Sequence, residues 1–192
     1  MRTFKGCVGL CGVLLLVLGI AAPSWSMSPR YMLYGRASLV AVEAPNLLKL
    51  RMLDQERVVT VRLLGVGSPR NRDRIKGLNP KVLSHIRRND VWKTSRDYVR
   101  SLLDGKQAEV WIRKWDSLDD KNRLLAYVFI PGGPDRSLDV NAEIIRKGLG
   151  FVTRDYVHVT FVGYRSLEEE ARKNRRGLWG ALPEGRLTSL PR

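Results

Sequence analysis

Three short stretches of alternating apolar and polar residues, close together in the first half of the chain, restrict the possible folds more than any other feature. They cover residues 38–42, 47–53 and 57–64, with Pro45-Asn46 after the first and Asp54-Gln55-Glu56 after the second. Alternation with a period of two is typical of half-buried β-strands, and short turn-forming segments indicate antiparallel neighbours. The pattern therefore predicts three antiparallel strands.

The middle of the chain changes from helical to strand periodicity. Residues 91–103 have apolar side chains at helical spacing, and Asp104-Gly105 marks the end of that helix. Strand patterns then cover 108–113 and 122–130. Three strands, a helix and two more strands are the expected order of a small barrel that closes on itself.

Two further helices are predicted in the last third, at 139–147 and 163–176, stopped by Gly148 and Gly177. In the last helix Glu168-Glu169-Glu170 come early and a group of basic residues comes late. This order suits the helix dipole, with acids near the N-terminus and bases near the C-terminus. Together the patterns predict an α+β protein, an OB-fold five-stranded β-barrel with three helices.

The first 26 residues have the pattern of a signal peptide. Arg2 and Lys5 form a positive start, residues 8–20 are apolar, and small residues follow at 21–26. The apolar run from 7 to 22 is shorter than the ~20 residues of a membrane-spanning helix. We expect an exported protein, periplasmic or secreted, without an integral membrane domain after cleavage. The alternative is an uncleaved segment that anchors the protein in a membrane.

Cysteine content and charge restrict the chemistry of the remaining chain. Cys7 and Cys11 both lie in the N-terminal segment, so the mature domain has no thiol for a disulfide, a zinc site or a nucleophile. The net charge of +15 favours a polyanionic partner, such as nucleic acid or another acidic polymer. A basic surface that serves only solubility is the alternative.

Four sequence blocks resemble the staphylococcal nuclease (thermonuclease, TNase-like) family. They are TVRLLGVGSPR at 60–70, DKNRLLAYV at 120–128, NAEIIRKGLG at 141–150, and the segment 168–179 with its Gly-Leu-Trp end. The blocks occur in the family's order, and the resemblance extends from about residue 38 to 180. It implies a nuclease-like domain at 37–180, a short lead-in at 27–36 and a C-terminal tail at 181–192.

The resemblance also implies a calcium site, and this chain departs from it. The family's nucleases bind calcium through acidic side chains and use a glutamate as general base or to orient water. Here Asn46 stands at a ligand aspartate, Ala44 at an earlier aspartate, Gly67 at the second ligand, and Arg70 at the glutamate. Calcium needs oxygen ligands, and a cation at Arg70 repels it. We expect no cofactor and a catalytically degenerate site.

The two phosphate-binding arginines of the family are retained as Arg62 and Arg123. The resemblance implies that both hold phosphate. Alternatively, Arg62 is a strand arginine on the solvent face, and Arg123 is a hairpin arginine that pairs with Asp119 or Asp120. Asn122 replaces the family's glycine before the second arginine, and the family's tyrosine in this block is missing.

A basic segment between the third strand and the first helix is a second candidate for nucleic-acid binding. Its cations are Arg70, Arg72, Arg74, Lys76, Lys81, Arg87 and Arg88. Such a segment can follow a phosphate backbone, with Trp92 or Tyr98 stacking on bases. A solvated loop, with the two aromatic residues packed in the core, is the alternative.

Other polar residues are weaker candidates. Glu43 and the group Asp116, Asp119 and Asp120 could form a replacement cation site, although a polar loop is the simpler interpretation. His85 and His158 are the only histidines, and we do not expect them to form a metal pair.

Three functions remain open from the sequence. The leading hypothesis is an exported pseudoenzyme that binds nucleic acid or another polyanion through a basic face. The sequence leaves its oligomeric state open, and a monomer is the default. The second is an active metal-dependent phosphodiesterase, an endonuclease with a rearranged site that uses calcium. The third is an envelope scaffold or protein-interaction module, because a fold does not determine a function.

Overall fold

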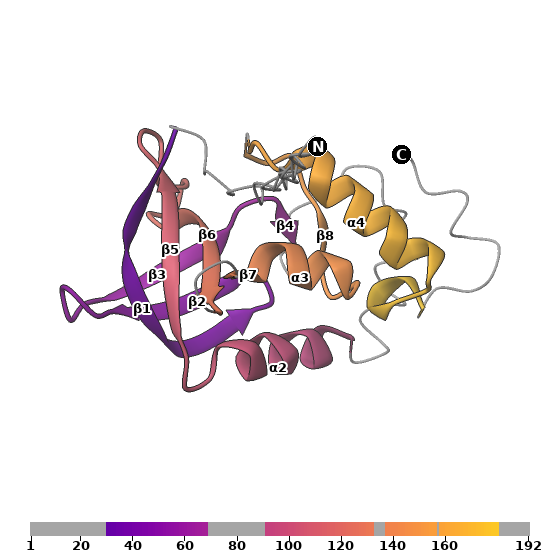
Figure 1. Cartoon of the computed structure of the whole chain (residues 1–192), viewed down its shortest axis with the longest axis horizontal. Helices are drawn as coiled ribbons and strands as arrows, with labels where there is room; N and C mark the ends of the chain where they lie inside the picture. The colour runs from indigo at the N-terminus through magenta and orange to yellow at the C-terminus, as the bar shows by residue number, and fades with distance from the viewer. Residues whose placement is uncertain (1–29, 69–90, 133–136, 157, 181–192) are drawn as a thin grey trace, which may run out of the picture.

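The computed structural model describes residues 30–68, 91–132, 137–156 and 158–180. Five strands form a closed barrel: β1 (Tyr31–Ala44), β2 (Leu47–Met52), β3 (Val58–Leu63), β5 (Gln107–Arg113) and β6 (Leu124–Pro131). Neighbours are antiparallel in the order β3-β2-β1-β5-β6, and a parallel pairing of β3 with β6 closes the ring. The predicted five-stranded OB-type barrel is confirmed (Figure 1).

The longest strand, β1, serves as the common wall of the barrel. It pairs with β5 along its first part and with β2 along its second part, and its register with β2 shifts after Leu39 and after Val42. Such bulges bend a strand and increase its twist, which helps a sheet to close. The strand begins at Tyr31 and therefore includes part of the segment expected to be a lead-in.

Three helices lie against the barrel: α2 (Val91–Leu103), α3 (Val140–Arg146) and α4 (Phe161–Lys173). Helix α2 packs against β1, while α3 packs against both α4 and β6 (Figure 1). The short 3-10 helix η1 (Gly177–Trp179) follows α4. Three short strands complete the described fold: β4 (Val66–Gly67) pairs with β8 (Phe151–Val152), and β7 (Ser137–Asp139) extends the sheet beyond β6.

The alternation seen in the sequence places the core. In β2 the side chains of Leu48, Leu50 and Met52 are buried, while their neighbours are half-buried or exposed. Val61 and Leu63 of β3 join them in one continuous hydrophobic core. Strand periodicity predicts these core positions correctly, because alternate side chains of each strand point into the single hydrophobic core of the barrel.

Asn141 fastens α3 to the barrel. Its side chain is fully buried, accepts a hydrogen bond from the backbone N–H of Val128 (3.1 Å), and donates to the carbonyls of Leu64 (3.0 Å) and Ala126 (3.2 Å). Asp139 caps the helix by accepting from Ala142 N (2.9 Å). These contacts hold α3 beside the ends of β3 and β6, where the candidate site lies.

The last helix differs from its prediction. Helix α4 begins at Phe161 and ends at Lys173, so Glu168 lies in its second half rather than in its first turn. The expected interaction of these acids with the helix dipole is therefore wrong. Glu168 is instead buried between Arg165 (3.3 Å) and Arg172 (3.1 Å). Gly177 begins η1 and does not end α4.

Across the four described ranges, no helix combines the length and the apolar character needed to cross a membrane.

Candidate functional site

Strand pairing brings the family-like positions together at one end of the barrel. Arg62 pairs with Leu47 on one side, next to Asn46 in the β1–β2 turn. On its other side Arg62 pairs with Leu125, two residues after Arg123. Backbone register alone therefore gathers the β1–β2 turn, the end of β3 and the start of β6.

Arg62 is buried, so its interpretation as a solvent-face arginine is wrong. Its side chain is only 6% exposed, and its Nη2 lies 3.2 Å from Oδ2 of Asp155. The guanidinium group also faces the ring of Tyr156, with 5.1 Å between Cζ and the ring centroid. Asp155 and Tyr156 come from the segment between β8 and α4, which covers this part of β3.

Arg123 has a carboxylate partner of its own. Its Nε donates to Oδ2 of Asp119 (2.6 Å), while the backbone N–H groups of Lys121 and Arg123 donate to Oδ1 (2.9 and 3.0 Å). Burial acts to raise the pKa of Asp119, but these hydrogen bonds outweigh it and hold the pKa below its usual value. The alternative interpretation, a hairpin arginine that pairs with Asp119 or Asp120, is thus confirmed for Asp119, and phosphate binding by Arg123 stays a prediction.

Asn122, which replaces the family's glycine, fits its position. Its φ of 57° lies in the left-handed region, where Asn is among the residues tolerated best. The hairpin that presents Arg123 can therefore form without glycine.

Tyr156 contacts Arg62 with its ring and reaches toward the loop that carries Arg123 with its hydroxyl. Its hydroxyl lies 3.5 Å from Oδ1 of Asp120. Burial raises the pKa of Tyr156, and charged groups from both sides of the site also act on this pKa, namely Arg62, Asp119, Asp120 and Arg123. The site thus places three carboxylates, including that of Asp155, beside two guanidinium groups. The local charge is more balanced than the net charge of the chain indicates.

The positions of the family's calcium ligands are occupied differently. The Asn46 side chain is fully buried and donates to the carbonyl of Val66 (2.9 Å). At Gly67 a single added methyl group would overlap the ring of Phe151, which packs over the glycine. Ser68 follows, buried, and its hydroxyl has no hydrogen-bond partner in the described part of the chain.

These residues do not fit a calcium ion. Calcium takes six to eight oxygen ligands, mostly carboxylates and carbonyls. Here one position has an amide that donates a hydrogen bond, and the other has an aromatic ring above a glycine. The described residues contain no group of three or more His, Cys, Asp or Glu side chains that could hold a metal.

Three of the four weaker acidic candidates are paired with a base, and the fourth, Asp120, lies 3.5 Å from the hydroxyl of Tyr156. Glu43 lies 2.8 Å from Lys49 Nζ, and Asp116 lies 2.8 Å from Arg113 Nη2. Asp119 belongs to Arg123, as described above. A replacement cation site made of Asp116, Asp119 and Asp120 is therefore wrong.

The remaining predicted residues divide between the core and undescribed segments. Tyr98 packs against the core, donates to Glu143 Oε1 (3.0 Å), and has its pKa raised to about 12, mainly by burial. Trp92 is half-buried, with Arg96 over its ring (5.0 Å). The basic residues of the second candidate, which are Arg70, Arg72, Arg74, Lys76, Lys81, Arg87 and Arg88, lie outside the described residues, as does His85.

His158 is a buried structural residue. Its Nε2 lies 3.1 Å from the carbonyl oxygen of Thr153, and its Nδ1 lies 3.1 Å from Oγ1 of Thr160. Burial lowers the pKa of His158, although the Thr153 carbonyl acts in the opposite sense. The imidazole links Thr153 and Thr160, which lie on either side of Asp155 and Tyr156 in the chain.

Sequence reasoning missed Phe151, Asp155 and Tyr156. All three follow the last residue of the NAEIIRKGLG block, in a region with no periodic pattern. The absence of a carboxylate at Gly67 was a usable signal, because a vacated side-chain volume in a packed interior must be filled from elsewhere.

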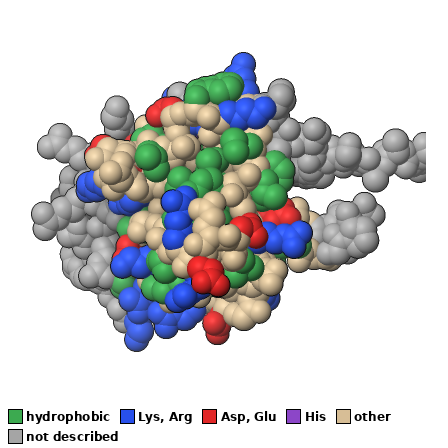
Figure 2. Space-filling view, turned by 90° about the vertical axis from the view of Figure 1, so that its left-hand side faces the viewer, with side chains coloured by type: hydrophobic (Ala, Val, Ile, Leu, Met, Phe, Trp, Pro, Cys, Tyr) green, Lys and Arg blue, Asp and Glu red, His purple; other side chains and the backbone are tan. Residues whose placement is uncertain are grey.

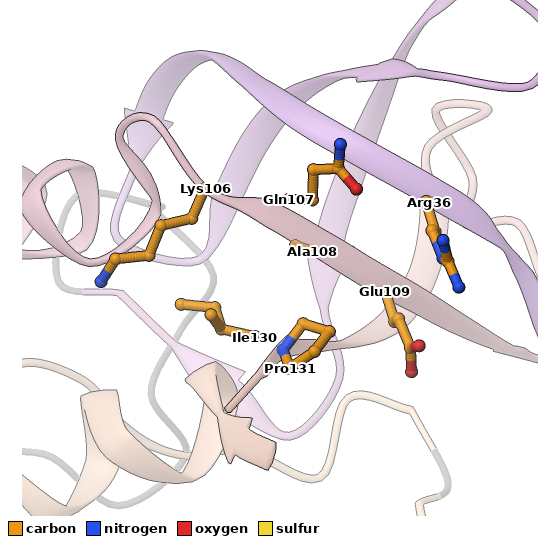
Figure 3. A pocket seen from close by; sticks show the side chains of 7 residues that line it. All are labelled: Arg36, Lys106, Gln107, Ala108, Glu109, Ile130 and Pro131. Atoms are coloured by element: carbon orange, nitrogen blue, oxygen red, sulfur yellow. The ribbon is translucent and has the colours of Figure 1, made fainter. Parts of the chain in front are cut away.

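A separate pocket lies far from these residues (Figure 3). It encloses about 450 Å³ beside β1 and β5 and is lined by Arg36, Lys106, Gln107, Ala108, Glu109, Ile130 and Pro131. Ile130 and Pro131 are at the opposite end of β6 from Arg123, roughly 20 Å along the strand. The pocket is therefore distinct from the candidate site.

Basic side chains are not concentrated on the barrel side of the molecule. Figure 2 shows Lys and Arg spread over this face between hydrophobic and acidic side chains. Among the described residues on this face, the basic side chains do not form one uninterrupted patch.

Comparison with known proteins gives consistent matches. The family model described as "Staphylococcal nuclease homologue" matches residues 60–181. A "Probable endonuclease LCL3" of Komagataella phaffii is 29% identical over 142 residues, which are 72% of this chain but only 56% of that protein. An "Uncharacterized endonuclease" of Escherichia coli, also found in strain O157:H7, is 26% identical over 130 residues, covering 68% of this chain and 69% of that protein.

Proposed function

Because this chain belongs to the staphylococcal nuclease family, we propose that it binds nucleic acid through its arginine site and has lost calcium-dependent cleavage. Nucleic acid is preferred over other polyanions since the family and the endonuclease names of the relatives both concern phosphodiesters. No cofactor is required for this binding.

The observation that carries the loss of cleavage is the packing of Phe151 on Gly67. Removal of a ligand carboxylate alone would leave a gap that water or a metal could enter. Here the aromatic ring fills that place, and Asn46 uses its amide to bond the backbone of Val66. Both changes convert a polar, ion-accepting pocket into packed interior.

The observation that supports binding is that Arg62 is retained and lies 3.2 Å from Asp155, a side chain that is partly exposed to solvent. Its guanidinium group is held in place by Asp155 and Tyr156 at the edge of the barrel. A planar guanidinium with five donors suits phosphate oxygens. A positive chain also attracts a polyanion at a distance.

The first test is a combined cleavage and binding assay on the purified protein. Single-stranded DNA and RNA are incubated with calcium, with other divalent ions and with chelator, and binding is measured in parallel. We expect binding without cleavage. Arg62→Ala should weaken binding, whereas Arg51→Ala, which removes an exposed arginine from β2, should have a smaller effect.

The second candidate, an active endonuclease, is favoured by the printed names of the relatives. Metal-dependent cleavage that Arg62→Ala abolishes would establish it and refute the loss of chemistry. Absence of both binding and cleavage would leave a scaffold role.

We also propose that the protein acts outside the cytoplasm, on the basis of the signal-like pattern of its first 26 residues. Expression of the full chain, followed by cell fractionation and N-terminal sequencing, tests this. A mature protein that begins after Ser24 or Ser26 supports export. A full-length protein in the membrane fraction supports an uncleaved anchor, and one in the cytoplasm refutes both.

A further inference from the structure

We propose that Asp155 is a built-in competitor for the anion-binding site of Arg62, so that a nucleic-acid phosphate binds there only by displacing this carboxylate. The inference rests on the proposed function, because it concerns the same arginine. It adds that the site is regulated from within the domain, by the segment between β8 and α4.

The two members of the pair differ in how they are held. The side chain of Arg62 is 6% exposed and lies on β3, which is paired on both sides, whereas that of Asp155 is 36% exposed. Tyr156 covers the guanidinium group from the neighbouring position. Asp155 is therefore the partner that can turn into water, while Arg62 stays in place.

The second arginine provides an internal comparison. Asp119 has a fully buried side chain and accepts hydrogen bonds from the backbone of Lys121 and Arg123 in addition to the guanidinium group. Exchanging that carboxylate for a phosphate would leave backbone donors unsatisfied. Arg123 is thus committed to holding its loop, and Arg62 is the arginine that can change partners.

Chemistry permits the exchange at Arg62. A carboxylate and a backbone phosphodiester each present two charged oxygens that accept paired hydrogen bonds from a guanidinium group. A ligand must first break the ion pair with Asp155, so its apparent affinity is lower than that of a vacant arginine. Removing the charge of Asp155 should therefore strengthen binding.

The test compares Asp155→Asn with Asp116→Asn in the full chain. Both variants remove one negative charge, but Asp116 pairs with Arg113 and is 70% exposed. Dissociation constants are measured for a fluorescein-labelled, single-stranded DNA of about 12 nucleotides at fixed salt. We expect Asp155→Asn to bind about fivefold more tightly and Asp116→Asn to change less than about twofold.

A double mutant separates this inference from the proposed function. In an Arg62→Ala background, Asp155→Asn should give no gain beyond that of Asp116→Asn. Equal gains from the two asparagine variants, or a gain that persists without Arg62, would overturn the competitor role. If Arg62→Ala itself leaves binding unchanged, the proposed function fails as well; if it weakens binding while Asp155→Asn has no effect, only the present inference fails.

Asp155→Ser provides a second substitution should Asp155→Asn fold poorly, and thermal melting of each variant shows which of them fold.

Discussion

At the scale of single residues, the site differs from its family through compensating pairs rather than isolated losses. Gly67 lacks a carboxylate, and Phe151 covers it. Arg62 keeps its charge, and Asp155 neutralises it. The absence of a carboxylate at Gly67 and the retention of Arg62 can both be predicted from the sequence, because the two residues lie in a motif that resembles the family's. Phe151 and Asp155 cannot, because their roles depend on tertiary contacts.

The first prediction concerns Gly67. Gly67→Ala should destabilise the protein by about 1–3 kcal/mol, because the new methyl group would overlap the buried ring of Phe151. Urea denaturation of the purified variant measures the change in the free energy of unfolding.

Gly163→Ala is the matched control for this substitution. A methyl group at Gly163 meets nothing within 4 Å, and the residue lies in α4, so alanine should stabilise by up to about 1 kcal/mol. Similar effects of the two substitutions would show that Phe151 does not fill the space above Gly67.

The second prediction concerns pH and His158. Because burial lowers its pKa, the folded protein binds fewer protons here than the unfolded chain, whose histidine titrates near 6.5. The contribution of His158 to the free energy of unfolding is therefore complete above about pH 6.5. It decreases as the pH falls below that value, by up to about 1.4 kcal/mol at pH 5.5. Chemical denaturation at pH 7.5 and 5.5 measures the difference.

His158→Gln should reduce this pH dependence, and His85→Gln, which changes the only other histidine, should preserve it. A pH dependence that His158→Gln leaves intact would assign the effect to other groups.

At the scale of secondary-structure elements, periodicity predicts the strands and helices well and their ends less well. The barrel strands and α2 occur where alternation and helical spacing place them, because each buries one face in a single core. The short strands β4, β7 and β8 contain two or three residues each, too few for a periodic signal. Helix α4 begins at Phe161, two residues before the predicted start, and its N-cap residue Thr160 makes no side-chain capping hydrogen bond.

The third prediction concerns the attachment of α3. Asn141→Ala should destabilise the protein by about 2–3 kcal/mol, because it leaves buried backbone groups of Leu64, Ala126 and Val128 without their partner. The change is measured by thermal and urea denaturation.

Asn174→Ala provides the comparison, since that side chain donates one exposed hydrogen bond to Glu170 O. Its effect should stay below about 0.5 kcal/mol. If Asn141→Ala is equally mild, water must replace the buried hydrogen bonds, and α3 is held by packing alone.

At the scale of the whole molecule, the charge of +15 sets the expected character of binding. On the face in Figure 2 the described basic side chains alternate with other types. Attraction to nucleic acid should therefore be broad and screened by salt, while Arg62 contributes one localised contact. The broad, salt-screened attraction follows from composition alone. The localised contact of Arg62 can be inferred only from the tertiary structure, because the burial of this side chain is not evident in the sequence.

The fourth prediction follows from this distribution. The affinity for single-stranded DNA should fall roughly tenfold or more between about 50 and 200 mM salt, and Arg62→Ala should reduce the slope of log affinity against log salt by about 0.7. Fluorescence anisotropy titrations at several salt concentrations provide the slope, and melting curves at the same concentrations check that the fold is unchanged. A salt-independent affinity would indicate base stacking instead of phosphate contacts.

The closure of the barrel by β3 and β6 also bears on the rate of folding. Residues 61–63 pair with residues 124–126, and α2 and β5 lie between them in the chain. The barrel therefore closes only when two segments about 60 residues apart in the sequence come together. Bringing distant segments together costs loop-closure entropy before the stabilising contacts form, and this cost slows folding. A chain that closes its barrel late stays unfolded longer after synthesis, and a long-lived unfolded state would favour the export that we propose above.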